Sequence, residues 1–93
     1  MKTFTFLLSD INYRYDLTPA DSHKSFYGKA EVIVLKDGTR VLRSYSTYVM
    51  VQDGCGNLYR TWDGWSATTG RHIKSFCGLN KAGVSALPTA RVY

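Results

Sequence analysis

The first part of the chain alternates apolar and polar residues with a period of two, which is typical of β-strands. Phe4, Phe6 and Leu8 fall on one side of such an alternation and predict an N-terminal strand. The stretch 12–23 is polar and contains a proline, so we expect a connecting loop there. A short strand at 13–17 is the alternative.

Three later stretches, 29–35, 40–51 and 58–62, are rich in β-branched and aromatic residues and are predicted as successive strands. Asp37-Gly38 separates the first two, and an Asp-Gly pair tolerates the positive φ angles of a two-residue hairpin loop. A glycine-rich turn at 53–57 separates the second and third. The pattern therefore predicts a three-stranded antiparallel meander, with the N-terminal strand as a candidate fourth.

The turns also predict which residues lie opposite one another. A two-residue loop at 37–38 places Val34 opposite Val41, and the next turn places Val51 opposite Leu58. The side chains of one face then form the expected core: Ala30, Val32, Val34, Val41, Tyr45, Val49, Val51, Leu58 and Trp62. The other face is mixed, and the N-terminal strand is expected to cover its apolar part.

After residue 65 the period changes from two to between three and four, which indicates a helix. Ser66 or Thr68 is a candidate N-cap, because a short hydroxyl accepts from the free N–H groups of the first turn. Ile73 and Phe76 share one side and are expected to pack on the valine face. Gly78 is a candidate C-terminal stop.

A second, shorter helix is predicted over 81–87, capped by Asn80 and ended by Pro88. Together these patterns predict one domain spanning 1–93. Its class is α+β: a three- to four-stranded antiparallel meander, one C-terminal α-helix packed on one face, and a short terminal helical turn.

Four stretches together resemble a known family: KSFYGKA at 24–30, LRSYSTYV at 42–49, WSATTGRHIKSF at 65–76 and LNKAGVSALP at 79–88. The pattern is similar to small domains of unknown function encoded by bacteriophages and mobile elements of Gram-positive and gut bacteria. This chain reads SYST where the family form is SYNT. The resemblance implies a phage or prophage origin and action inside the host cytoplasm. It implies no activity.

The composition narrows the class of partner. The 93 residues carry a net charge of +5, with Glu31 as the only glutamate, which favours nucleic acid or an acidic protein surface as partner. Cys55 and Cys77 show no zinc-ligand spacing, so we expect two reduced thiols, no metal and no cofactor. The N-terminal apolar stretch is too short for a signal peptide, and no stretch approaches a membrane span, so no membrane partner is expected.

Enzymatic activity is the third of three hypotheses about function. His72 could serve as a general base with Arg71, Thr69 and Tyr45 in a nuclease-like set, with Arg71 holding a phosphate. No motif fixes the spacing of such a set, and a single candidate base is a weak signal. We therefore expect a non-enzymatic protein.

Nucleic-acid binding is the second reading. A three-stranded sheet followed by a helix is a known DNA-binding layout, in which basic side chains contact phosphates and tyrosines stack on bases. The candidate residues for binding nucleic acid or another partner are Lys29, Arg43, Tyr45, Tyr48, Tyr59, Arg60, Arg71, His72 and Lys74.

Protein binding is the leading hypothesis. The chain is then a small phage accessory protein that acts on a host protein as an inhibitor or adaptor. The second sheet face, with Tyr48, Met50 and Tyr59, has the aromatic and methionine composition of an interface. It could equally pack on residues 3–8 or form a homodimer. In the segment 24–29, Gly28 is read as a bulge at a sheet edge, with a ligand site as the alternative.

Overall fold

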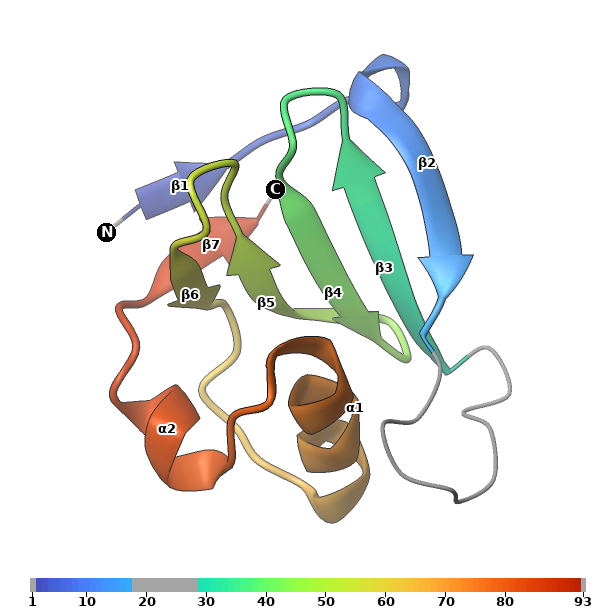
Figure 1. The fold of residues 1–93 in the computed structure, drawn as a ribbon. Coiled ribbons are helices and arrows are strands. Elements are labelled where there is room, and N and C mark those ends of the chain that lie inside the picture. The colour runs from blue at the N-terminus through green and yellow to red at the C-terminus, as the bar shows by residue number, and fades with distance from the viewer. Residues whose placement is uncertain (1, 18–28, 93) are drawn as a thin grey trace.

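The computed structural model describes residues 2–17 and 29–92, and Figure 1 shows their arrangement. Within this part of the chain the fold is α+β, as predicted. The main sheet is antiparallel, in the order β2-β3-β4-β5-β6. Its strands are β2 (Ile11–Asp16), β3 (Ala30–Leu35), β4 (Arg40–Ser44), β5 (Thr47–Gln52) and β6 (Leu58–Arg60).

A small parallel sheet joins the two ends of the chain, pairing β1 (Lys2–Phe4) with β7 (Ala90–Val92). A short 3-10 helix at Leu8–Asp10 leads into β2. The helices are α1 (Ala67–Cys77) and α2 (Lys81–Ser85), and Figure 1 shows both on the side of the main sheet away from the small one. The main sheet is therefore covered on both faces.

The two faces bury different clusters. The helix face gathers Ala30, Val32, Val34, Leu42, Val49, Met50, Ile73, Phe76 and Val84, with Leu17 at its margin. The strand face gathers Ile33, Leu35, Val41 and Val51, packed against Phe4, Phe6, Ile11, Tyr48, Tyr59 and Val92. The expected cover by the N-terminal segment is confirmed, because Phe4 and Phe6 lie on the strand face. The single valine face is wrong, because Val41 and Val51 belong to the opposite cluster from Val32.

That error has one cause, the length of the glycine turns. The Leu35 amide donates to the Thr39 carbonyl and the Gly38 amide to the Leu35 carbonyl, so the loop is 36–38 and has three residues. Val34 consequently lies opposite Arg40 rather than Val41. The turn at 54–56 repeats this geometry, and Val51 lies opposite Tyr59 rather than Leu58. A one-residue shift in register moves every side chain to the other face.

The predicted long strand 40–51 is also wrong, because the chain reverses within it. Ser44 pairs with Thr47, so Tyr45-Ser46 is a two-residue hairpin loop between β4 and β5. A register shift after Leu42 then adds an extra residue on β5, which lets both Val49 and Met50 reach the helix face. β2 corresponds to the alternative strand at 13–17. With β2 and the extra strand of this hairpin, the main sheet has more strands than predicted.

The helical predictions are confirmed. Ser66 caps α1 by accepting from the Thr69 amide at 3.1 Å, and Gly78 ends it in the left-handed conformation. Ile73 and Phe76 are buried on the helix face. Asn80 caps α2, which ends at Ser85, two residues before the predicted bound. The predicted bulge at Gly28, and the segment 24–28 as a whole, lie outside the described residues.

Candidate functional site

The β4-β5 hairpin places a tyrosine in a conformation that usually belongs to glycine. Tyr45 has φ +56°, and among the described residues no other non-glycine has a positive φ. It is the first residue of a two-residue loop, and a hairpin with positive φ at this position alone matches the type II′ turn, in which glycine is preferred. A bulky residue there is an outlier whose surroundings must hold it in place.

Four contacts hold Tyr45. Its amide donates to the Lys29 carbonyl at 2.7 Å, and its carbonyl accepts from Arg43 Nη1. Its ring lies at 5.9 Å from the His72 ring, and the Lys29 ammonium lies 6.0 Å from its centroid. The side chain nevertheless stays 47% exposed. The fold therefore fixes an aromatic ring at the surface beside a cation.

A buried polar cluster lies under Tyr45 and connects β4 to α1. Ser44 Oγ is 2.8 Å from His72 Nδ1 and 3.0 Å from Thr69 Oγ1. All three side chains are buried, and His72 is 0% exposed. These hydrogen bonds satisfy polar atoms that would otherwise destabilise the interface between the sheet and the helix. They anchor the strand from which Tyr45 projects.

The electrostatics of this end of the sheet are positive. Burial lowers the pKa of His72 below its ordinary value, and the charges of Arg71 and Lys29 lower it further. His72 is therefore neutral at pH 7. Arg71 and Lys29 are both exposed, and the Lys29 ammonium lies over the Tyr45 ring.

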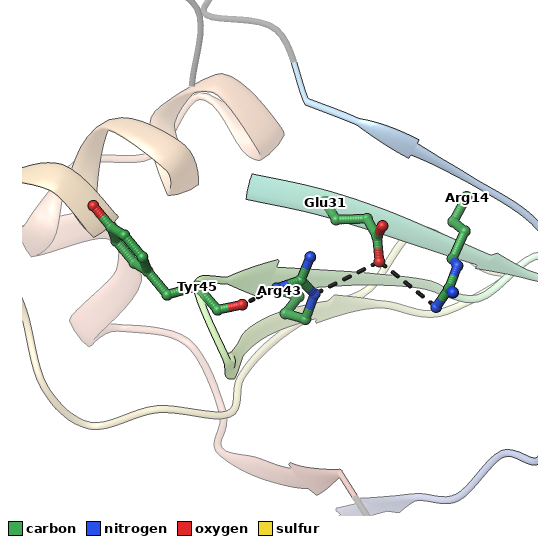
Figure 2. A network of polar contacts seen from close by, with 4 residues as sticks. All are labelled: Arg14, Glu31, Arg43 and Tyr45. Atoms are coloured by element: carbon green, nitrogen blue, oxygen red, sulfur yellow. Dashed lines mark hydrogen bonds and ion pairs between the residues drawn. The ribbon is translucent and has the colours of Figure 1, made fainter. Parts of the chain in front are cut away.

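A row of charges crosses the strand face of the sheet toward this hairpin (Figure 2). Glu31 Oε1 lies 3.8 Å from Arg14 Nη1 and 3.6 Å from Arg43 Nε, and Arg43 continues to the Tyr45 carbonyl. Arg43 is thus engaged in holding the hairpin. These contacts make it less available to a partner.

The structure places the predicted binding residues in different parts of the fold. Lys29 and Tyr45 meet at the surface, Arg71 and Lys74 are exposed on α1, and the charges of Lys29 and Arg71 both act on His72. His72 lies beneath them, out of reach of a partner. We call Lys29, Tyr45 and Arg71 the hairpin site.

Tyr48 and Tyr59 are placed elsewhere. Tyr48 packs edge-on against Phe6 at 6.1 Å and Tyr59 against Phe4 at 5.3 Å, so the face predicted as an interface is occupied by the N-terminal segment. Met50, the third residue of that prediction, is buried on the helix face. The alternative packing against residues 3–8 is confirmed.

Arg60 lies beside β7, where the Arg60 amide donates to the Pro88 carbonyl at 2.9 Å. Its Nε is buried and has no hydrogen-bond partner among the described residues. An open hollow of about 420 Å³ adjoins it, lined by Arg60, Thr61, Trp62, Asp63, Thr89, Ala90 and Arg91. This hollow was not predicted from the sequence, because it depends on β7, whose three residues show no strand pattern.

The cysteines and the acidic residues form no site. Cys55 is exposed and Cys77 half-buried, and both are free, with burial raising the pKa of the Cys77 thiol. Within residues 2–17 and 29–92, no group of three or more His, Cys, Asp or Glu side chains could hold a metal ion. No helix in this part of the chain is both long and apolar enough to cross a bilayer.

Comparison with known families gives one match. The model of the family of unknown function DUF8033 matches residues 15–89, which is most of the chain. The chain belongs to DUF8033. Searches of curated proteins and of solved structures found no match.

The region matched by DUF8033 runs from the end of β2 through α2 and contains the stretches on which the resemblance rests. In the structure, the SYST and ATTGRHI stretches meet in the buried cluster of Ser44, Thr69 and His72. Sequence reasoning missed Ser44.

Proposed function

We propose that this chain is a non-enzymatic accessory protein, encoded by a phage or prophage, that binds an acidic surface of a host protein in the host cytoplasm. The hairpin site is the proposed contact. The observation that carries the proposal is Tyr45, an exposed aromatic ring held at positive φ between Lys29 and the buried His72. The net charge of +5 supports an acidic partner.

The strain at Tyr45 supports a role in binding rather than folding. A left-handed conformation costs a residue with a Cβ about 1–2 kcal/mol, and glycine would avoid this cost. Strained residues that the surrounding structure holds in place are concentrated at functional sites. Tyrosine and arginine are also enriched among the residues that dominate binding energy at protein interfaces.

The burial of His72 supports the non-enzymatic part of the proposal. A general base must come within hydrogen-bond reach of the proton that it removes. His72 is fully buried, and its Nδ1 is already bonded to Ser44. Of the nuclease-like set, Arg71 and Tyr45 are exposed while Thr69 is buried with His72.

Single-stranded nucleic acid is the second candidate partner, because the exposed Tyr45 ring has the Lys29 cation beside it. Bases stack on exposed aromatic side chains while lysine and arginine contact the phosphates. The site offers few cations, however, and the number of phosphate contacts sets the strength of non-specific binding. We therefore place an acidic protein surface first.

The test is a pull-down from nuclease-treated host lysate, comparing wild type, Tyr45→Phe and Tyr45→Gly. Tyr45→Gly removes the ring at a position where glycine fits the backbone, so the fold is retained. We expect one host protein to be retained by wild type and Tyr45→Phe and lost with Tyr45→Gly. Equal retention by wild type and both variants would contradict the hairpin site.

A second arm separates the two partners. Fluorescence anisotropy with random single-stranded and duplex oligonucleotides is measured at increasing salt. Binding that disappears in Tyr45→Gly and falls steeply with salt would replace the protein partner by nucleic acid. Pull-down that survives nuclease, with no oligonucleotide binding, is the outcome expected from our proposal.

A further inference from the structure

We propose that β2 pairs antiparallel with β2 of a second copy of this chain, so that the main sheet continues through a two-fold axis. β2 is the first strand in the sheet order and has β3 on one side only. The opposite edge is different, because Arg60 of β6 bridges to Thr89 and bonds to Pro88. Among the described strands of the main sheet, β2 thus presents the open edge, independently of the hairpin site.

The hydrogen bonds to β3 show which main-chain groups of β2 point away from β3. The Leu17 amide donates to the Ala30 carbonyl at 2.9 Å. Main-chain groups of successive residues in a strand point to opposite sides, so Tyr15 and Tyr13 also direct theirs toward β3. Arg14 and Asp16 therefore direct their N–H and C=O groups outward, where a second strand can bond them.

The charges on this edge favour one register. Asp16 lies directly opposite Glu31, and like charges in opposed positions are unfavourable. Glu31 has Arg14 and Arg43 near it, whereas Asp16 has no ion pair with a described residue. If Arg14 lies opposite Asp16 of the second copy, each Asp16 gains a cation, and the alternating row in Figure 2 continues across the axis.

The same register aligns the tyrosines. Tyr13 and Tyr15 stack at 6.2 Å on the helix-face side of β2 and are 54% and 39% exposed. Arg40 Nη2 donates to Tyr15 Oη at 3.0 Å, which holds that ring in place. Pairing Arg14 with Asp16 puts each Tyr15 opposite its own counterpart. The four rings of the dimer then form one continuous aromatic ladder.

Charged residues and bulges also occur on edge strands that avoid pairing. Here the register shift between Ile11 and Tyr13 limits the straight edge to its second half. The charges on that half, however, are of opposite sign and self-complementary under a two-fold axis. They select a register rather than prevent pairing, and the short edge predicts a weak, concentration-dependent dimer.

The test is sedimentation equilibrium of wild type, Arg14→Asp, Asp16→Arg and a mixture of the two variants. In the proposed register each variant alone places like charges opposite each other, while the mixture places opposite charges at both contacts. We expect wild type to dimerise, each variant to be monomeric, and the mixture to form a heterodimer. Wild type that stays monomeric up to about 1 mM would overturn the proposal.

Cross-linking checks the register with a matched control in a Cys55→Ser background. Tyr15→Cys places two thiols opposite each other across the axis, within the range of a disulfide. Tyr13→Cys places its thiol opposite Leu17 of the second copy. We expect oxidation to give a covalent dimer with Tyr15→Cys and not with Tyr13→Cys. A dimer that persists in Arg14→Asp and Asp16→Arg, or a host peptide bound at β2 in place of a second copy, would also overturn it.

Discussion

The chain reverses in two kinds of turn, the glycine turns at 36–38 and 54–56 and the tyrosine turn at Tyr45-Ser46, which differ in the residue placed at positive φ. The loops 36–38 and 54–56 place Gly38 at φ +93° and Gly56 at φ +91°. They lie at the same end of the main sheet and touch, since a Cβ on Gly38 would meet Gly54 Cα at 3.6 Å. The β4-β5 loop, at the other end, places Tyr45 at positive φ instead.

The difference shows where each turn gets its stability. The glycine turns are local: Asp37 Oδ1 accepts from the Thr39 amide at 2.9 Å, and Asp53 Oδ1 accepts from the amides of Cys55 and Asn57. The tyrosine turn depends on residues distant in sequence, namely Lys29 and the buried His72. A turn that needs tertiary support to hold a strained, exposed ring is the one that we connect to binding.

The largest expected effect comes from removing the support beneath the tyrosine turn. His72→Ala leaves a cavity between sheet and helix and removes the partner of Ser44, and we expect it to lower the free energy of unfolding by about 2–4 kcal/mol. Urea unfolding measures this. Thr68→Ala, an exposed neighbour on α1, is the control and should change stability by less than about 0.5 kcal/mol. A His72→Ala protein as stable as that control would show that the turn does not depend on the cluster.

A substitution in a glycine turn should lower the free energy of unfolding less than His72→Ala does. Gly38→Ala forces a Cβ into the left-handed region, and we expect a loss of about 1–2 kcal/mol in unfolding free energy. The added methyl has room, at 3.6 Å from Gly54, so the loss measures conformation rather than a clash. Lys36→Ala in the same loop is the control and should be near neutral. Equal stability of Gly38→Ala and Lys36→Ala would contradict the local origin of the turn.

The elements that a local signal specifies could be predicted from the sequence. The α+β class, the cap at Ser66, the stop at Gly78 and the burial of Ile73 and Phe76 all follow from hydroxyls, glycine and periodicity. The loop length at Asp37-Gly38 could not be read in the same way. Two- and three-residue hairpin loops both use glycine at positive φ, and only pairing across the sheet distinguishes them.

The tyrosine turn and the small sheet were beyond local signals. The stretch SYST has the residue types of a strand, and no residue in it signals that the chain reverses. The contacts that stabilise the Tyr45 turn come from α1 and Lys29. β1 and β7 are three residues each and form only because both ends of the chain meet. Gly70 looks unfavourable in a helix, yet the Trp65 ring occupies the space where its Cβ would be.

The candidate site was predicted only in part, for the same reason. Lys29, Tyr45 and Arg71 were singled out by charge and aromatic character; the structure places Lys29 beside the Tyr45 ring, and the charges of Lys29 and Arg71 both act on His72. Tyr48 and Tyr59 have the same chemistry but pack under Phe6 and Phe4. Residue type alone cannot separate the exposed tyrosines from the covered ones when both faces of a sheet are buried.

Replacing Tyr45 by glycine has a smaller effect on stability and a large one on binding. Tyr45→Gly relieves the positive φ but loses ring packing on His72 and adds chain entropy to the unfolded state. We expect unfolding free energy within about 1 kcal/mol of wild type, measured by urea unfolding. Tyr45→Phe is the control. A loss above about 2 kcal/mol for Tyr45→Gly would mean that the tyrosine is there for folding.

The smallest effect is the dependence of stability on pH. The folded-state pKa of His72 is lowered by burial and then by Arg71 and Lys29, so the unfolded state takes up a proton first as the pH falls. This contribution is fully present above about pH 6.5 and is lost as the pH decreases below it. At pH 6 the loss from one histidine is at most about 0.8 kcal/mol. Unfolding curves between pH 7.5 and 5.5 test this, with His72→Asn as the control that should lose the slope. If His72→Asn keeps the same slope of unfolding free energy against pH, the dependence arises from another group. The neutral state of His72 beneath Tyr45 would then be contradicted.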